Sequence, residues 1–154
     1  MQSNTVTLEL GAQSSVIWHF DAEGSLLPLH LNLGIQTLAS RCFHNDPPQP
    51  IEMEHAIEVT EEIVMPFSKR IEQAPVLLLT GIGRVEMNQI LETAGVHDGA
   101  PSLSAIESLF TRLTSISQGR PKSQDPIRSD KHAFALLVIV RELMHHLKFD
   151  HVQL

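Results

Sequence analysis

The fold of this chain is decided by the stretch Val6-Thr7-Leu8-Glu9-Leu10-Gly11-Ala12-Gln13-Ser14-Ser15, in which an apolar strand ends in a glycine turn. A second such stretch is Val76-Leu77-Leu78-Leu79-Thr80-Gly81-Ile82-Gly83-Arg84, and the two are separated by about the length of a compact βαβ unit. Glycine lets the backbone approach a ligand closely, and bare N–H groups in such turns donate to phosphate oxygens. The two stretches therefore predict turns on neighbouring strands that form one half of a phosphate-binding cleft.

Length, composition and charge indicate one globular domain over residues 1–154. Hydrophobic residues make up 42% of the 154 residues, which is enough for a core, and the net charge is -7. An acidic chain lacks the excess of Lys and Arg that neutralises nucleic-acid phosphates or anionic lipids, so we expect neither nucleic acid nor membrane among its partners. Cys42 is the single cysteine and stands in an apolar stretch, which predicts a buried residue.

No targeting segment is recognisable in the sequence. Residues 1–4 lack the basic and apolar regions of a signal peptide, and the longest apolar run, residues 133–140, is too short to cross a bilayer. Because a lone cysteine also allows no internal disulfide, these features predict a cytoplasmic protein.

The spacing of apolar residues predicts a mixed α/β domain. We expect strands at 6–10, 15–20, 25–32, 75–80 and 150–153, and helices at 34–43, 51–73, 84–95, from Ser102 or Ser104 to about 117, and 129–148. The first three strands form an antiparallel meander, and strand 75–80, which lacks alternation, is expected to be buried on both faces. The order βββαβαβ indicates a ribonuclease-H-like or actin-like lobe, a mixed five-stranded sheet with helices packed on its faces.

Finer patterns predict which side chains are buried. Val16, Trp18 and Phe20 alternate on one face of their strand, and Trp18 is expected in the core because no basic patch makes it a base-stacking platform. Pro66 is expected to kink the long helix. Four glutamates of that helix are expected to form a solvated face: Glu54, Glu58, Glu61 and Glu62.

Nine histidines invite comparison with metal sites. Glu142 and His145 have the E-x-x-H spacing of di-iron carboxylate bundles, but the sequence has no second such pair for a facing helix. We therefore expect His145 and His146 to complement the C-terminal dipole of their helix. His19 and His30 show no zinc-like spacing with the other histidines.

Five short motifs occur in order along nearly the whole chain: E-L-G-A-Q-S-S-V at 9–16, L-P-L-H-L-N-L-G at 27–34, D-P-P at 46–48, G-I-G-R-V at 81–85 and R-S-D at 128–130. They resemble the D-x-G-G-G-S-T-E, S-L-P-L-G, D-P-P, G-x-G-G-T and R-x-D motifs of the second lobe of the exopolyphosphatase and guanosine pentaphosphatase phosphatases, of the actin-like superfamily. With the glycine turns, the resemblance implies a site for phosphate or nucleotide made by Gly11, Ala12, Gln13, Ser14, Ser15, Gly81, Gly83 and Arg84.

The departures from these motifs bear on catalysis. Glu9 stands where the resemblance implies a metal-side Asp, and it can still coordinate a hard cation such as Mg²⁺. Ala12 and Gln13 replace two loop glycines, and Val16, which cannot accept a proton, replaces the Glu implied to activate water. Arg84 and the next residue replace a Gly-Thr pair. Since the other lobe of the family is also missing from the sequence, we assign no catalytic residue.

Two functions from different classes are consistent with these observations. The first is a binding or interaction protein, a stand-alone and catalytically impaired lobe whose Gly11 and Gly81 turns bind phosphate or a nucleotide. A lone lobe exposes an apolar surface, so we expect a homodimer or a protein partner to cover it. The alternative is a Mg-dependent phosphohydrolase of polyphosphate, guanosine polyphosphate or nucleotide that is active only as a homodimer or with a partner lobe. A scaffold whose turns bind nothing is a third possibility.

Overall fold

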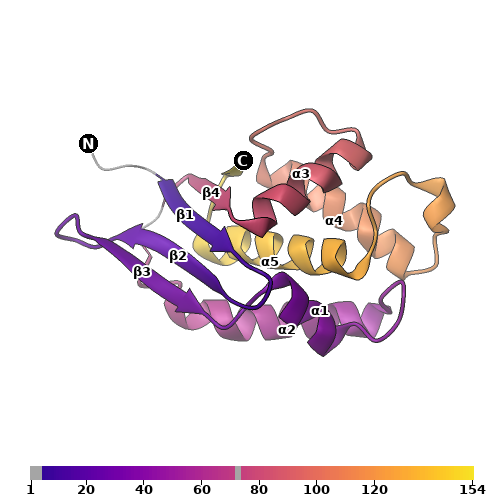
Figure 1. The fold of residues 1–154 in the computed structure, drawn as a ribbon, viewed down its shortest axis with the longest axis horizontal. Helices are drawn as coiled ribbons and strands as arrows, with labels where there is room; N and C mark the ends of the chain where they lie inside the picture. The colour runs from indigo at the N-terminus through magenta and orange to yellow at the C-terminus, as the bar shows by residue number, and fades with distance from the viewer. Residues whose placement is uncertain (1–4, 72–73) are drawn as a thin grey trace.

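The antiparallel meander predicted at the start of the chain is present in the computed structural model, which describes residues 5–71 and 74–154 (Figure 1). β1 (Thr5–Leu10) pairs with β2 (Ser15–Phe20), and β2 pairs with β3 (Leu26–Leu31). The carboxylate of Asp21 accepts the N–H groups of Glu23 and Ser25 and so closes the β2–β3 turn. Local turn chemistry thus fixes this half of the sheet.

Two parallel strands complete the sheet on the other side of β1. β4 (Val76–Thr80) pairs with β1, and β5 (His151–Gln153) pairs with β4, which gives the strand order β3-β2-β1-β4-β5. The predicted α/β fold class, a mixed five-stranded sheet with helices packed against it, is confirmed. Because β1 and β4 are parallel neighbours, the turns that follow them lie at the same end of the sheet.

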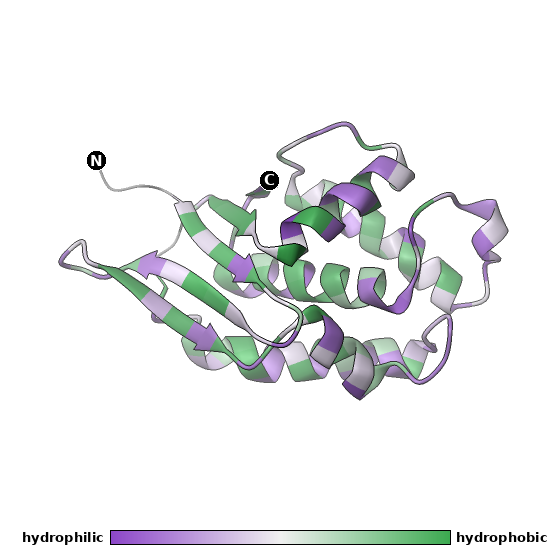
Figure 2. Cartoon of the chain, in the orientation of Figure 1, coloured by the Kyte–Doolittle hydropathy of each residue, from purple (hydrophilic) through white to green (hydrophobic). Residues whose placement is uncertain are grey.

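Five α-helices accompany the sheet: α1 (Ile35–Cys42), α2 (Pro50–Val64), α3 (Ile82–Ala94), α4 (Leu103–Ser117) and α5 (Lys131–Leu147). The helix α5 is the centre of the core, and residues 133–140 are fully buried because this helix is apolar on every side (Figure 2). The other four helices all contact α5, and parts of α2 and α5 lie behind the sheet in Figure 1. Cys42 is buried, as predicted.

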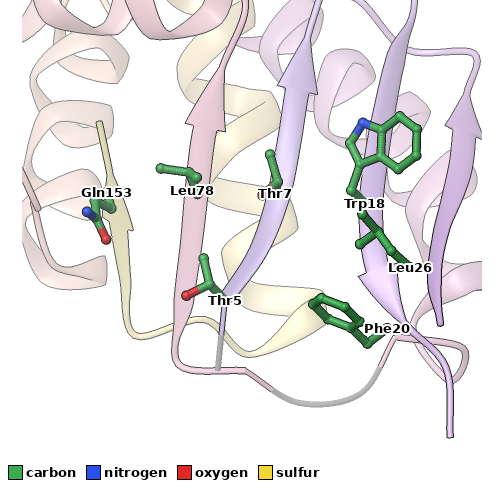
Figure 3. A pocket seen from close by; sticks show the side chains of 7 residues that line it. All are labelled: Thr5, Thr7, Trp18, Phe20, Leu26, Leu78 and Gln153. Carbon is green, nitrogen blue, oxygen red and sulfur yellow. The ribbon is translucent and has the colours of Figure 1, made fainter. Parts of the chain in front are cut away.

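The opposite face of the sheet corrects two predictions. Val16, Trp18 and Phe20 do share a face of β2, but they are half-exposed, and the buried face of that strand consists of Ser15, Ile17 and His19. β4 is likewise buried on one face only, since its fully buried residues alternate with half-exposed ones. A cavity of about 510 Å³ lies on this open face (Figure 3). It is lined by Thr5, Thr7, Trp18, Phe20, Leu26, Leu78 and Gln153.

The long helix predicted over 51–73 is shorter than expected. α2 ends at Val64, and Pro66 lies in a 3₁₀ turn, Met65–Phe67, rather than at a kink. Proline has no N–H to donate to the preceding turn, so the α-helical pattern stops there. The expected end at Gln73 lies outside the described residues.

The start of α3 also differs from the prediction. The helix begins at Ile82 rather than near Arg84, and the apolar side chain of Val85 in its first turns is 56% exposed. Its end agrees with the prediction, because Gly95 forms a left-handed C-cap. Within the described parts of the chain, no helix has both the length and the apolar character needed to cross a bilayer.

Candidate functional site at the ends of β1 and β4

The two predicted glycine turns lie side by side. Glu9 and Thr80 are register partners near the ends of β1 and β4, so the Gly11 and Gly81 turns leave the sheet together. A Cβ placed on Gly81 would lie 2.9 Å from the carbonyl oxygen of Leu10, and one on Gly83 would lie 2.7 Å from the Leu10 side chain. Both glycines therefore permit the close approach of the second turn to the first.

The first turn directs its carbonyl groups to the start of α1. The carbonyl oxygen of Gly11 accepts the N–H of Ile35 at 3.1 Å, and that of Ala12 accepts the N–H of Gln36 at 2.8 Å. The hydroxyl of Thr37 donates to the carbonyl of Gln13 at 3.1 Å. These contacts satisfy the amides that a helix start otherwise leaves without acceptors.

Three other helices also have their own capping groups. The Glu52 side chain reaches back to the N–H of Gln49 before α2, whose first residue is a proline without an N–H. Ser102 caps α4 by accepting from Ala105, and Asp130 caps α5 by accepting from Ala133. These are the usual acceptors for orphan helix N–H groups.

The start of α3 is different. Its N-cap is Gly81, which has no side chain, and in residues 5–71 and 74–154 no acceptor is recorded for the N–H groups of Ile82, Gly83 and Arg84. Ile82 and Arg84 are exposed at the positive end of the helix dipole, whereas Gly83 is buried against Leu10. Such a helix start favours an anion, above all a phosphate.

The amides of the first turn are equally free. Across the described stretches, no hydrogen bond is recorded from the N–H groups of Ala12, Gln13 or Ser14, although the carbonyls of this turn are engaged. This turn and the start of α3 follow neighbouring parallel strands, and no acceptor is recorded for the amides of either among the described residues. Backbone amides without a protein acceptor can bind a phosphate group.

The predicted site side chains differ in accessibility. Gln13, Ser14 and Arg84 are exposed, whereas Ser15 is buried and its hydroxyl donates to the carbonyl of Leu33 at 2.6 Å. The hydroxyl of Ser15 therefore supports the strand end and its proton is already used. No acidic partner of Arg84 is recorded in the portions that the structure covers, which leaves its guanidinium free to bind an anion.

Glu9 is the carboxylate that the sequence predicts as a metal ligand. It is exposed, and its Oε2 accepts a long hydrogen bond of 3.4 Å from the indole N–H of Trp18. Its register partner on β2 is Val16, which offers no ligand or base. A single carboxylate suits Mg²⁺ when waters and substrate phosphates supply the remaining ligands, so the residues present fit the ion only together with a phosphate.

The R-S-D motif supports α3 from behind. The Arg128 guanidinium contacts Asp130 at 2.9 Å and Glu86 of α3 at 3.6 Å. Burial is the largest single influence on Asp130 and would raise its pKa, but the hydrogen bonds from Arg128 and the Ala133 N–H, together with the charge of Arg128, hold that pKa below its usual value. These ion pairs fix the first turns of α3 against the start of α5.

Sequence reasoning missed the partners of the α5 histidines. His145 contacts Glu107 of α4, and His146 contacts Glu61 of α2, which is half-buried rather than part of a fully solvated face. Glu61 and His146 are 85 positions apart, so no local spacing could have linked them.

No protein-family model and no curated protein sequence matches this chain. Solved structures do match its fold. A Ppx/GppA phosphatase of Aquifex aeolicus matches with a TM-score of 0.71 and 16% identity over 97% of this chain and 52% of that one. An exopolyphosphatase-like protein matches with a TM-score of 0.71 and 13% identity over 99% and 54% of the two chains. An exopolyphosphatase from Cytophaga hutchinsonii matches with a TM-score of 0.59 and 18% identity over 96% and 51%.

The likeness extends over nearly all of this chain, which spans about half the length of the structures it matches. At these identities the likeness establishes a shared fold. The chain thus has an α/β fold that is similar to one half of a Ppx/GppA phosphatase.

Proposed function

We propose that the Gly11 and Gly81 turns bind the phosphate group of a small molecule, a polyphosphate or a nucleotide, without hydrolysing it unaided. The observation that supports the proposal is the start of α3, where no acceptor among residues 5–71 and 74–154 is recorded for three backbone amides, next to the first turn, whose amides likewise have none recorded. Arg84, exposed in the same turn, adds a positive charge. Backbone amides bind phosphate without a basic surface, so such a site is compatible with the acidic net charge of this protein.

A titration with inorganic tripolyphosphate tests this proposal. In ¹⁵N-resolved NMR spectra we expect the largest shifts at the amides of residues 12–14 and 82–84. We also expect a higher melting temperature, since a ligand bound only to the native state stabilises it. Shifts confined to other parts of the chain would refute the assignment.

An arginine pair provides the matched control. Arg84→Gln removes the charge at the site and is expected to weaken tripolyphosphate binding roughly tenfold, the equivalent of one charge-assisted contact of about 1.4 kcal/mol. Arg70→Gln removes an equally exposed charge before β4, at the other end of that strand, and should leave binding unchanged. Equal loss in both variants would indicate a general charge effect.

A homodimer is the second part of the proposal. Ile82 and Val85, 46% and 56% exposed, place apolar side chains beside the free amides of α3. This chain matches about half of each solved structure, and the other half of those structures is of similar length. A second copy of this chain would supply the same amount of polypeptide. Sedimentation equilibrium should give the mass of two chains for the native protein and of one chain for Val85→Asp. A monomeric native protein at micromolar concentration would exclude this pairing.

Glu9 favours a second candidate function, a Mg-dependent phosphohydrolase that works only with a partner lobe. The exposed carboxylate at the end of β1 is the group that would share Mg²⁺ with substrate phosphates. Phosphate release from tripolyphosphate should then require Mg²⁺ and be lost in Glu9→Gln, while Glu23→Gln in the β2–β3 turn should retain it. Release that is unaffected by Glu9→Gln would exclude this function.

A further inference from the structure

A cluster of metal-binding side chains lies between α2 and α5, away from the glycine turns. α5 is followed by Asp150, whose N–H donates to the carbonyl of Pro75 at the start of β4, whereas Gly81 follows the end of that strand. The cluster borders a cavity of about 280 Å³. The cavity is lined by Ile57, Glu61, Arg141, Glu142, His145 and His146.

Three ligand atoms converge in this cavity. The Nε2 atom of His146 lies 3.3 Å from Oε2 of Glu142, one helical turn earlier on α5, and 3.4 Å from Oε1 of Glu61 on α2. Ligand atoms of all three residues lie within 4.8 Å of one another. Zinc-like ions bind nitrogen and oxygen at about 2.0–2.2 Å, which separates neighbouring ligands of a tetrahedral ion by roughly 3.4 Å. Two of the three separations already have this value.

The cluster has more acceptors than hydrogen-bond donors. One ring nitrogen carries at most one proton, and His146 Nε2 is recorded in a hydrogen bond with Glu61 but only in an ion pair with Glu142. The other oxygen of Glu142, Oε1, already accepts a hydrogen bond from Arg141 at 2.7 Å. Of the two carboxylate oxygens that face His146, Glu142 Oε2 therefore has no recorded hydrogen bond from the ring. A cation coordinated by both oxygens and by the ring nitrogen would give each of the three atoms a partner.

The charges around the cavity favour a divalent ion. Arg141 bridges Glu142 and Glu107, and its guanidinium is also held over the ring of Phe110 at 4.4 Å. With neutral histidines, the carboxylates of Glu61, Glu107 and Glu142 outweigh this single guanidinium by two negative charges. The Glu142 side chain is only 4% exposed, so such an imbalance is costly when nothing compensates it.

The cavity is open to ions in solution. The Glu61 side chain is 39% exposed and that of His146 is 25% exposed, in contrast to the buried Glu142. An ion can therefore reach the two accessible ligands and be anchored by the buried one. Two carboxylates and an imidazole suit ions of the zinc, cobalt and manganese class, since magnesium and calcium prefer oxygen ligands alone.

We propose that Glu61, Glu142 and His146 bind a divalent transition-metal ion of the zinc class, which links α2 to α5. Glu61 Oε1, Glu142 Oε2 and His146 Nε2 provide three protein ligands, and water completes the coordination. The ion holds the C-terminal end of the core helix α5 to α2. It is separate from the Mg²⁺ considered at Glu9, and its ligands belong to different elements.

Calorimetric titration of the untagged, chelator-stripped protein with Zn²⁺ tests the site, with Co²⁺ as a spectroscopic probe. We expect one equivalent of Zn²⁺ to bind, a higher melting temperature, and visible Co²⁺ absorption typical of low coordination number. His146→Asn and Glu61→Gln should each raise the dissociation constant at least about tenfold, since even outer-shell changes cost that much. Unchanged affinity in either variant would overturn the assignment.

Neighbouring residues provide matched controls. His145→Asn removes the adjacent histidine, and Glu58→Gln removes a carboxylate one turn from Glu61. Both variants should bind Zn²⁺ as the native protein does. Loss of binding in His145→Asn would move the site to the Glu107 pair and refute the proposed ligands. If the native protein does not bind Zn²⁺ at all, the proposal is refuted. The three side chains would then be held together by a proton between them, without a metal ion.

The metal proposal is independent of the phosphate proposal. Arg84→Gln should lose tripolyphosphate affinity and retain Zn²⁺ affinity, whereas His146→Asn should do the reverse. Glu142→Gln adds a third ligand test, and circular dichroism before the titration separates a lost ligand from a lost fold. Because the ligand positions of Glu61 and His146 are partly exposed, those two variants keep the test valid if Glu142→Gln unfolds.

Discussion

The helices α1 and α3 begin at the same end of the sheet, yet the N–H groups of their first turns differ in their hydrogen bonds. At the start of α1, carbonyl oxygens of the Gly11 turn accept the helix amides, and Gly34 packs so closely that no side chain fits. At the start of α3, Gly81 brings the helix against Leu10 but supplies no acceptor. Both helix starts need glycine, but among the described residues acceptors are recorded only for the first amides of α1 and not for those of α3.

The difference separates structural from ligand-binding glycine turns. Where the chain itself satisfies the amides of a helix start, that start stabilises the fold and has no donors to offer. Where the amides lack an acceptor, the folded protein is less stable than it could be, and an anion bound there can accept their hydrogen bonds and stabilise it. Substitutions at the two starts should therefore affect stability and binding unequally, and the following experiments test this contrast.

The largest effect is expected for Gly34→Ala at the closed start. The added Cβ would lie 2.4 Å from the Ala12 carbonyl oxygen and 2.5 Å from the Gln13 carbonyl carbon, both backbone atoms that cannot rotate away. We expect a loss of about 3 kcal/mol or more in the free energy of unfolding, as for severe overpacking. Urea denaturation measures this. Gly99→Ala, where nothing lies within 4 Å, is the control and should change stability little.

Gly81→Ala at the open start should cost less stability but abolish phosphate binding. Gly81 has φ 75°, which penalises any side chain, and its added Cβ would lie 2.9 Å from the Leu10 carbonyl. We expect a loss of about 2 kcal/mol. Gly95→Ala has a similar φ of 76°, but its ψ of 23° places it in the left-handed helical region, and it has no contact within 4 Å, so it should cost less stability than Gly81→Ala. Equal losses in both variants would mean that neither the backbone conformation of Gly81 nor its close approach to Leu10 adds to the cost.

The two glycine turns and the meander were predictable from the sequence, because turn chemistry and strand patterning are local. The pairing of β1 with β4 joins distant residues such as Thr5 and Val76, and it was expected only from the spacing of the two stretches. The open face of the sheet was not predictable, since Trp18 and Phe20 alternate in the same way whether helices or solvent cover them. The capping of α1 by the Gly11 turn depends on contacts across about 25 positions and was also missed.

The same limit applies to the charged groups. Arg112 and Asp125 form a two-pronged ion pair with distances of 3.0 and 2.6 Å, although neither belongs to a recognisable motif. The sequence predicts Glu61 on a solvated face together with Glu58 and two other glutamates of the same helix. Only the position of α5 shows that Glu61 faces a histidine.

Acid titration tests the carboxylate of Asp125. Like the first amides of α1, this carboxylate has its hydrogen-bond partners within the protein. Hydrogen bonds from Arg112 lower the pKa of Asp125 from 3.8 to about 2. Because the folded-state pKa is the lower one, this stabilisation is complete above about pH 4 and is lost as the pH falls towards 2. The shift corresponds to about 2 kcal/mol.

Denaturant midpoints measured between pH 7 and pH 2 check this expectation. Asp125→Asn should remove most of the decline in stability that this carboxylate causes below pH 4. Asp46→Asn is the control, since Asp46 pairs with Lys122 in an exposed position and should have little effect. A decline of the same size in Asp125→Asn would show that other carboxylates govern acid unfolding.

The smallest expected effect most sharply separates the two helix starts. Thr37→Val removes a hydroxyl that donates to the Gln13 carbonyl at 3.1 Å, so stability should fall by about 0.5–1 kcal/mol. Thr111→Val, which loses only a hydrogen bond within its own helix, measures the cost of valine in a helix. Thr37→Val should leave tripolyphosphate affinity unchanged, because the bond it removes uses a carbonyl rather than a free amide. If affinity falls, the closed start of α1 positions the ligand-binding turn, and the two starts act as one unit.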